Sequence, residues 1–185
     1  MESTDESKYI IRVATLEDMP RLLEIYSYYV AETTISFEYV VPTLEEFADR
    51  FKTIIKKYPY LVMEKNGEIV GYAYANTYKG RAAYDWCVET TIYLDKIQRG
   101  KGAGTQLYTA LESYLKKQNI LNLNACITYP NPRSIQFHER LGYEKNAHFH
   151  KCGYKFNEWH DMIWMEKIIG EHKLDMEDVI WFENL

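Results

Sequence analysis

A glycine-rich stretch in the middle of the chain has the residue types and spacing of an anion-binding loop. It reads Gln98-Arg99-Gly100-Lys101-Gly102-Ala103-Gly104-Thr105, with a glycine at every second position from Gly100 to Gly104. Glycine allows positive φ and lets backbone N–H groups approach a ligand closely, and N–H groups at a helix start attract anions. The stretch therefore predicts a cradle for a phosphate or pyrophosphate. Arg99 and Lys101 add positive charge, although Lys101 also fits a solvated loop position.

The residues around this stretch predict a strand that leads into a helix. Residues 90–94, Thr-Thr-Ile-Tyr-Leu, favour a strand. Leu107, Leu111 and Leu115 recur at helical spacing after the last glycine. The stretch does not match two known phosphate-binding motifs. A Walker loop requires G-x-x-x-x-G-K-[ST], and a dinucleotide fingerprint requires G-x-G-x-x-G. A flexible turn remains an alternative explanation for the glycines alone.

Two side chains near this stretch have the chemistry for proton transfer. Glu89 stands in a strand of apolar and hydroxylated residues, where a carboxylate is disfavoured. It is a candidate general base, and a paired structural acid or a solvent-facing position is the alternative. His138 lies in a predicted helix over residues 133–141. Imidazole, with an unperturbed pKa of about 6.5, can donate or accept a proton near neutrality, although most single helical histidines are surface residues.

The predicted elements follow the order of a mixed α/β fold. Thr43 and Glu46 form a capping box, and Asn66-Gly67 predicts a hairpin turn. The helix between strands 84–94 and 121–127 predicts that these two strands pair in parallel. Strands are expected at residues 9–13, 60–64, 68–77, 84–94, 121–127, 143–154 and 155–167, with helices at about 15–30, 43–57, from the glycines to 117, and at 133–141 and 175–181.

Composition limits the class of protein. The 185 residues, 46% of them hydrophobic, suit one domain, 1–185, with a flexible segment 1–8, a core over about 9–168 and an extension 169–185. No apolar run approaches the roughly 20 residues of a membrane span, and the polar start predicts no signal peptide. Three dispersed cysteines indicate a reducing, cytoplasmic setting. The net charge of −5 argues against nucleic acid as a partner.

Five stretches in this order resemble the GNAT superfamily of N-acetyltransferases. The likeness is strongest to its phosphinothricin and methionine sulfone or sulfoximine acetyltransferase subfamily. These stretches are residues 34–38 (TISFE), 88–93 (VETTIY), 98–105 (QRGKGAGT), 134–143 (SIQFHERLGY) and 153–161 (GYKFNEWHD). The resemblance implies a mixed α/β GNAT fold with a mostly antiparallel sheet that splays between two parallel strands. It also implies acetyl-CoA as cosubstrate, bound through its pyrophosphate at the glycine loop.

The resemblance also assigns roles to individual residues. Glu89 takes the place of the proposed general base. His138 replaces a tyrosine that serves as the acid in the wider family, so acid, base and substrate contact all remain open for it. Asn131 and Ser134 are expected to bind the pantetheine arm. Backbone groups of Ile92, Tyr93 and Leu94 are expected to bind the pantetheine amides, and the N–H of Leu94 or of a neighbour to polarise the thioester carbonyl.

The acceptor implied by the resemblance is a small α-amino acid with a sulfone, sulfoximine or phosphinate group. Arg81 is expected to bind its carboxylate or tetrahedral group. Phe37, Tyr84, Tyr129, Tyr154 and Trp159 are expected to wall the pocket, with ordinary packing positions as the alternative. His148, His150 and His160 are not expected to bind metal, because no carboxylate or cysteine completes a set by spacing.

Other functions stay open on the sequence. A protein N-terminal acetyltransferase would use the same cosubstrate but needs an open groove for a peptide. A non-catalytic CoA-binding module would bind the cosubstrate without turnover. Relatives commonly pair through their C-terminal halves, so the resemblance also implies a homodimer.

Overall fold

One seven-stranded mixed sheet organises the described residues, 9–98 and 102–185 of this computed structural model. Its order is β1-β2-β3-β4-β5-β7-β6, and the β4–β5 pair is parallel whereas the others are antiparallel. The strands are β1 (Ile10–Val13), β2 (Tyr60–Lys65), β3 (Glu68–Thr77), β4 (Cys87–Leu94), β5 (Asn122–Tyr129), β6 (Glu144–Lys155) and β7 (Glu158–Ile168). The expected mixed α/β fold and the parallel pair are both confirmed.

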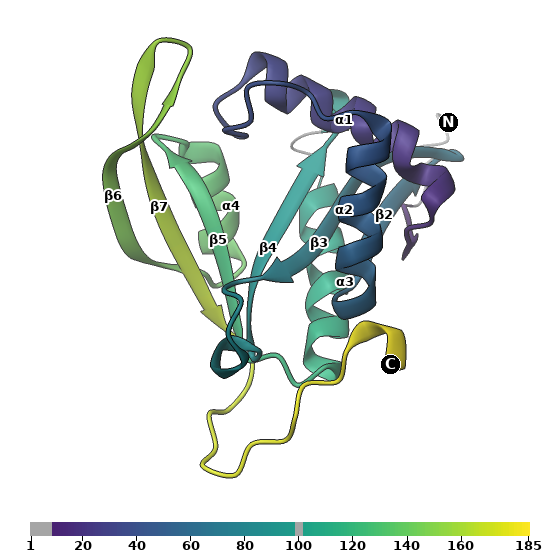
Figure 1. Ribbon diagram of the computed structural model, residues 1–185, viewed down its shortest axis with the longest axis vertical. Helices are drawn as coiled ribbons and strands as arrows, with labels where there is room; N and C mark the ends of the chain where they lie inside the picture. The colour runs from purple at the N-terminus through teal and green to yellow at the C-terminus, as the bar shows by residue number, and fades with distance from the viewer. Residues whose placement is uncertain (1–8, 99–101) are drawn as a thin grey trace, which may run out of the picture.

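Helices cover both faces of this sheet (Figure 1). They are α1 (Met19–Glu32), α2 (Leu44–Lys57), α3 (Ala103–Lys117) and α4 (Pro132–Arg140). Side chains of β4 alternate between the two faces, as a strand requires. The ring of Tyr93 packs on Tyr26 and Tyr29 of α1, whereas Ile92 lies 3.6 Å from the Cβ position of Gly104 in α3. Odd-numbered β4 residues therefore face α1 and α2, and even-numbered ones face α3 and α4.

The two central strands separate after a short paired segment. Pairing between β4 and β5 is confined to Cys87 with Asn122, Val88 with Leu123 and Glu89 with Asn124. Both strands continue beyond that point, and they diverge towards the top of Figure 1. Glu89 thus stands where the splay begins. Backbone groups on the β5-facing edge of β4 beyond this point lose their strand partner, which suits them to an extended ligand.

Local signals in the sequence define several element ends. Thr43 N and Glu46 Oε2 lie 2.8 Å apart and Glu46 N and Thr43 Oγ1 3.2 Å apart, which is the predicted capping box of α2. The hairpin between β2 and β3 turns at Asn66 and Gly67, whose φ values are 54° and 80°. Positive φ at both positions is the geometry that an Asn-Gly turn favours.

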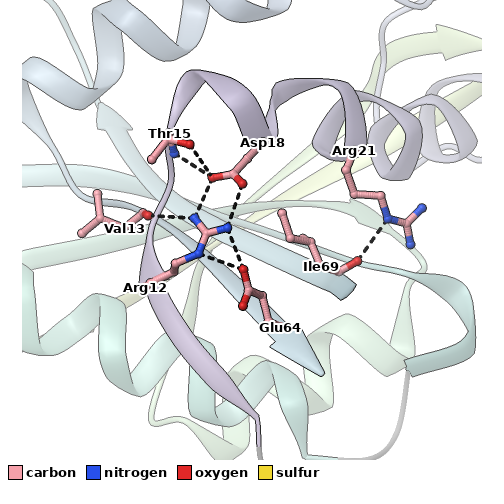
Figure 2. A network of polar contacts seen from close by, with 7 residues as sticks. All are labelled: Arg12, Val13, Thr15, Asp18, Arg21, Glu64 and Ile69. Atoms are coloured by element: carbon pink, nitrogen blue, oxygen red, sulfur yellow. Dashed lines mark hydrogen bonds and ion pairs between the residues drawn. The ribbon is translucent and has the colours of Figure 1, made fainter. Parts of the chain in front are cut away.

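An arginine joins β1, β2 and the start of α1 (Figure 2). Arg12 donates from Nη1 and Nη2 to the carboxylate of Asp18 at 2.7 and 2.8 Å, and from Nε to Glu64 at 2.8 Å. The hydrogen bonds from Arg12 hold the pKa of Asp18 below its usual range. Thr15 opens a 3-10 turn, Leu16–Asp18, rather than α1 itself, so the predicted helix begins four residues later.

Two further predicted elements differ from the structure. The strand expected from residue 84 begins at Cys87, because Ala82–Tyr84 forms a 3-10 turn. The helix expected at 175–181 is wrong. The backbone carbonyls of this segment bond to side chains elsewhere in the domain instead of forming helical hydrogen bonds. Trp86 donates to Glu177 O, Gln118 to Ile180 O and Asn119 to Asp178 O, at 2.7–2.9 Å.

These bonds hold the tail along the lower end of the domain (Figure 1), where it ends in a 3-10 turn, Phe182–Asn184. Among the described residues, none of the helices combines the length and apolar character that crossing a bilayer would require.

Candidate active site

A cavity of about 240 Å³ lies in the splay between β4 and β5. It brings Glu89 and His138 to one space, although Glu89 is on the α1–α2 face and His138 on the α3–α4 face. The space continues through the sheet because the two strands no longer pair here. Other wall residues come from the α1–α2 link, β4, β5, α4 and β7; they include Ser36, Phe37, Thr91, Tyr93, Cys126, Thr128, Asn131, Ser134 and Met162.

Glu89 has the surroundings of a proton acceptor. Its side chain is half-buried at the last paired position of β4. Within residues 9–98 and 102–185 its carboxylate has no hydrogen-bond or ion-pair partner, which argues against a paired structural acid. Burial raises its pKa above the usual range of a glutamate. A carboxylate with a raised pKa binds a proton more readily, as a general base must.

His138 is buried and neutral. Its ring nitrogen Nδ1 lies 2.8 Å from the carbonyl oxygen of Ser134, which can only accept, so Nδ1 carries the proton. Burial lowers the pKa of His138 to about 4, with the Ser134 hydrogen bond opposing this in part. The other nitrogen, Nε2, is buried without a partner in the described part of the chain. Near neutrality, His138 therefore offers a lone pair and not a proton.

A second cavity, of about 410 Å³, adjoins the first on the α3–α4 face. Gly102 opens α3 with φ 79°, a left-handed conformation that favours glycine. A Cβ on Gly104 would meet the ring of Phe137 at 3.0 Å, so glycine permits the close approach of α3 and α4. Ile92, Leu94 and Thr105 also line this space. The cavity therefore fits a long ligand that runs from the start of α3 to the splay.

One face of α4 supplies residues that the sequence analysis missed. Arg133, Phe137 and Arg140 line the larger cavity together with Asn131 and Ser134. Their spacing of four and three residues places them on one helical face, which was a readable signal. The Asn131 side chain caps α4 by accepting from Ser134 N at 3.2 Å. Two guanidinium groups beside a helix start suit the phosphates of a nucleotide cosubstrate.

The predicted cofactor residues have several outcomes. Arg99, Gly100 and Lys101 lie outside the described residues. Gln98 is buried and its Oε1 accepts from Tyr9 at 3.4 Å, and Ala103 is buried in α3. The N–H of Leu94 donates to the Tyr29 hydroxyl at 3.2 Å, so it is already engaged. A thioester carbonyl would therefore need a neighbouring donor.

The predicted acceptor residues do not converge. Phe37 lines the smaller cavity. Tyr84 lies in the exposed 3-10 turn before β4 and packs on Tyr78, and Arg81 directly precedes this turn. Tyr129, Tyr154 and Trp159 do not line that cavity. On β7, Trp159 alternates with His160, which contacts Phe37, so Trp159 faces the other side of the sheet.

The α1–α2 link is joined to the β6–β7 hairpin. Lys155, only 3% exposed, donates to the carbonyl oxygens of Val30, Thr33 and Ser36 at 2.6–2.8 Å. The Tyr39 hydroxyl donates to the Tyr154 carbonyl at 2.5 Å. A Cβ on Gly153 would fall 1.9 Å from the Phe37 ring, so glycine lets the link lie against the hairpin. These contacts bridge one side of the smaller cavity.

The spacing of histidines did not reveal a carboxylate beside them. The fold nevertheless places Asp161 against both His148 and His150. His160 is elsewhere, with its Nε2 3.0 Å from the carbonyl oxygen of Lys155.

Comparison with known proteins agrees with this geometry. A family model described as acetyltransferase (GNAT) domain matches residues 11–164. The chain is 37% identical to a phosphinothricin N-acetyltransferase of Streptomyces viridochromogenes, over 82% of this chain and 83% of the relative. It is 34% identical to an L-methionine sulfoximine/L-methionine sulfone acetyltransferase of Pseudomonas aeruginosa, over 84% of this chain and 92% of that relative.

A solved structure has the same fold and contains the expected cosubstrate. The crystal structure of a GNAT superfamily phosphinothricin acetyltransferase from Sinorhizobium meliloti, in complex with AcCoA, superposes with a TM-score of 0.89. The sequences are 32% identical, and the match covers 96% of this chain and 97% of that one. The chain therefore belongs to the GNAT family of N-acetyltransferases, and within it to the phosphinothricin and methionine sulfoximine acetyltransferase-like enzymes.

Proposed function

We propose that this enzyme transfers the acetyl group of acetyl-CoA to the amino group of a small amino-acid-like acceptor, of the phosphinothricin, methionine sulfone or methionine sulfoximine type. The observation that carries the proposal is the carboxylate of Glu89 at the start of the splay, which has no hydrogen-bond or ion-pair partner among residues 9–98 and 102–185 and lines a cavity of about 240 Å³ together with His138. The relatives named for these acceptors are the source of the acceptor class.

The residues support a direct transfer between two bound substrates. Acetyl-CoA fits the larger cavity, because Gly102 and Gly104 leave room and Arg133 and Arg140 add positive charge. An acceptor that enters from the α1–α2 face meets Glu89, which takes the ammonium proton directly or through a water. The amine nitrogen then bonds to the acetyl carbon, the carbon–sulfur bond breaks, and CoA leaves as thiolate.

His138 acts in this scheme as a hydrogen-bond acceptor. Its Nδ1 proton is held by the Ser134 carbonyl, so the free lone pair is on Nε2. Nε2 is buried, so it would accept a proton of the amine or of a water only after the ring turns towards the cavity. The neutral ring has no proton available at Nε2 for the departing thiolate. Protonation of the thiolate is therefore left to water or to the proton that the amine releases.

The bridged hairpin favours a small acceptor over a peptide. Lys155, Tyr39 and Gly153 hold the α1–α2 link against β6. This bridge closes one side of the smaller cavity and so narrows the space through which a polypeptide could bring its N-terminus to Glu89. A free amino acid needs no such path, and the cavity volume suits a molecule of that size.

An acceptor panel tests the proposal. The enzyme is mixed with acetyl-CoA and, separately, with methionine sulfone, methionine sulfoximine, phosphinothricin and short peptides, and thiol release is followed. We expect turnover with at least one small amino acid and none above background with the peptides. Faster turnover of the peptides would favour N-terminal acetylation of proteins. Binding of acetyl-CoA without turnover of any amine would favour a binding module.

A further inference from the structure

The outer hairpin of the sheet gathers two histidines and a carboxylate outside the cavities described above. His148 and His150 lie on β6, and Asp161 lies on β7. A register shift between Phe149 and Gly153 makes a bulge in β6 opposite Asp161, with Lys151 at φ 48°. A bulge re-aims the side chains of its strand. Here it brings both imidazoles to the same carboxylate.

The three donor atoms form a compact set. His148 Nε2 lies 2.8 Å and His150 Nδ1 lies 3.0 Å from the same oxygen, Oδ2 of Asp161. All three ligand atoms lie within 4.8 Å of one another. The other oxygen, Oδ1, accepts from the backbone N–H of Lys151 at 2.7 Å, which fixes the orientation of the carboxylate. The ring of Tyr129 packs on the ring of His148, with the two ring centroids 4.7 Å apart, and this packing limits the movement of His148.

This spacing is close to what a tetrahedral metal ion requires. With metal–nitrogen and metal–oxygen bonds of roughly 2.0–2.1 Å, neighbouring ligand atoms stand about 3.3 Å apart. The two nitrogen–oxygen separations, 2.8 and 3.0 Å, would need to open by only a few tenths of an ångström, and the two nitrogens lie within 4.8 Å of each other. The hydrogen bond to Oδ1 already supplies the outer contact that orients metal-binding side chains in proteins.

We propose that His148, His150 and Asp161 bind one divalent transition-metal ion of the zinc class. Two imidazole nitrogens and one carboxylate oxygen suit Zn²⁺, Ni²⁺ or Cu²⁺, whereas Mg²⁺ and Ca²⁺ prefer sites made of oxygen alone. Three protein ligands leave one tetrahedral position for water. The ion would tie the β6 bulge to β7.

The proposed site is separate from the acetyl-transfer cavity. None of its three ligands lines the cavities around Glu89 or beside α4. Asp161 also alternates with His160, which contacts Phe37, so its side chain faces away from the acceptor side. Acetyl transfer is therefore expected to proceed without the ion, and metal binding can be tested independently.

Calorimetric titration of the tag-free, full-length protein with zinc chloride tests this site. We expect one ion per chain, and no binding of magnesium chloride in the same range. His150→Gln, at a side chain that is 77% exposed, should preserve the fold and weaken zinc binding at least about tenfold. Asp161→Asn should do the same, with circular dichroism to check its fold.

His172→Gln is the matched control, because His172 is exposed and bonds to Asn122, far from the cluster. Its affinity for zinc should equal that of the wild type. Absence of zinc binding by the wild type would overturn the proposal. Unchanged affinity in His150→Gln would overturn it as well, since the ion would then sit on other residues.

Discussion

The larger cavity beside α4 is lined mostly by two short motifs, whereas the smaller cavity at the splay takes its walls from many separate elements. Gly102 to Thr105 and Asn131 to Arg140 supply most of the first. The second combines the α1–α2 link, β4, β5, α4 and β7. Within a short motif, the spacing of residues along the sequence determines where their side chains lie. The relative positions of residues on separate strands depend on strand register, which the sequence does not show directly.

The two cavities also differ in charge and in polar partners. The larger one has two arginines and a helix start, which complement an anion. The smaller one has an unpaired carboxylate and an unpartnered imidazole nitrogen among its described residues. The first arrangement suits binding, and the second suits proton movement. Substitutions should therefore separate affinity for the cosubstrate from the rate of transfer.

The largest effect is expected from Glu89→Gln. The amide keeps the shape of the side chain but accepts a proton poorly, so kcat should fall roughly 10²–10⁴-fold, the usual contribution of a general base. The KM for acetyl-CoA should stay close to that of the wild type. Steady-state kinetics at saturating acceptor provide the measurement.

The pH profile sharpens this result. Wild-type kcat/KM should rise with pH, and the neutral state of His138 predicts no separate titration of that residue near pH 6.5, because burial lowers its pKa to about 4. The acceptor amine also titrates, so the profile is repeated with an acceptor of different amine pKa. Nearly full kcat in Glu89→Gln would show that another group or bulk water takes the proton.

A smaller effect is expected from Arg133→Gln combined with Arg140→Gln. Removing two charges from the larger cavity should raise the KM for acetyl-CoA several-fold, since exposed charge pairs contribute about 0.2–1 kcal/mol each. The effect should shrink at high salt, and the KM for the acceptor should not change. Lys56→Gln, at an exposed position of α2, is the control. Equal changes in both KM values would contradict the division between the cavities.

For physical reasons, more of the residues expected at the cofactor line the larger cavity than residues expected at the acceptor line the smaller one. Gly102, Gly104, Asn131 and His138 lie in short motifs whose spacing determines their positions. The helical spacing of Arg133, Phe137 and Arg140 also indicates a shared face of α4, but the two arginines were not recognised as site residues. The side of the sheet that Trp159 faces follows from its alternation with His160 on β7, which contacts Phe37, and the sequence alone does not state this.

Other errors arose from long-range contacts. Asp161 reaches His148 and His150 only because of the bulge at Lys151, a register change without a clear sequence signal. Residues 175–181 have helical character locally, but distant side chains such as Gln118 take their backbone carbonyls. By contrast, the expected order of strands and helices was confirmed up to the end of β7, because periodicity and turns such as Asn66-Gly67 act locally.

The smallest effect is a difference in stability between two glutamates. Burial raises the pKa of Glu89, which has no partner among the described residues. Glu112 is the opposite case: burial opposes ionisation, but hydrogen bonds from Lys167 at 2.6 Å and Lys116 at 3.0 Å hold its pKa below the usual range. The same Glu→Gln change should therefore have opposite signs at the two positions.

The sign at Glu89 follows from proton linkage. Below the unfolded-state pKa of about 4.3 both states are protonated, and the residue has no effect. As pH rises, the unfolded state loses its proton first, so the folded state binds more protons and loses stability until pH exceeds the folded-state pKa. Glu89→Gln removes this loss. Its melting temperature should equal the wild-type value near pH 4 and exceed it at pH 7–8.

At Glu112 the folded-state pKa is lowered, so its stabilising contribution is present above the unfolded-state pKa and is lost as pH falls through the folded-state value. Glu112→Gln should therefore melt below the wild type at pH 7–8, and the difference should narrow in acid. Thermal unfolding by circular dichroism at pH 4, 6 and 8 gives both curves. A lower melting temperature for Glu89→Gln at pH 7–8 would mean that the carboxylate is stabilised in the folded state, which is incompatible with a base held ready by burial alone.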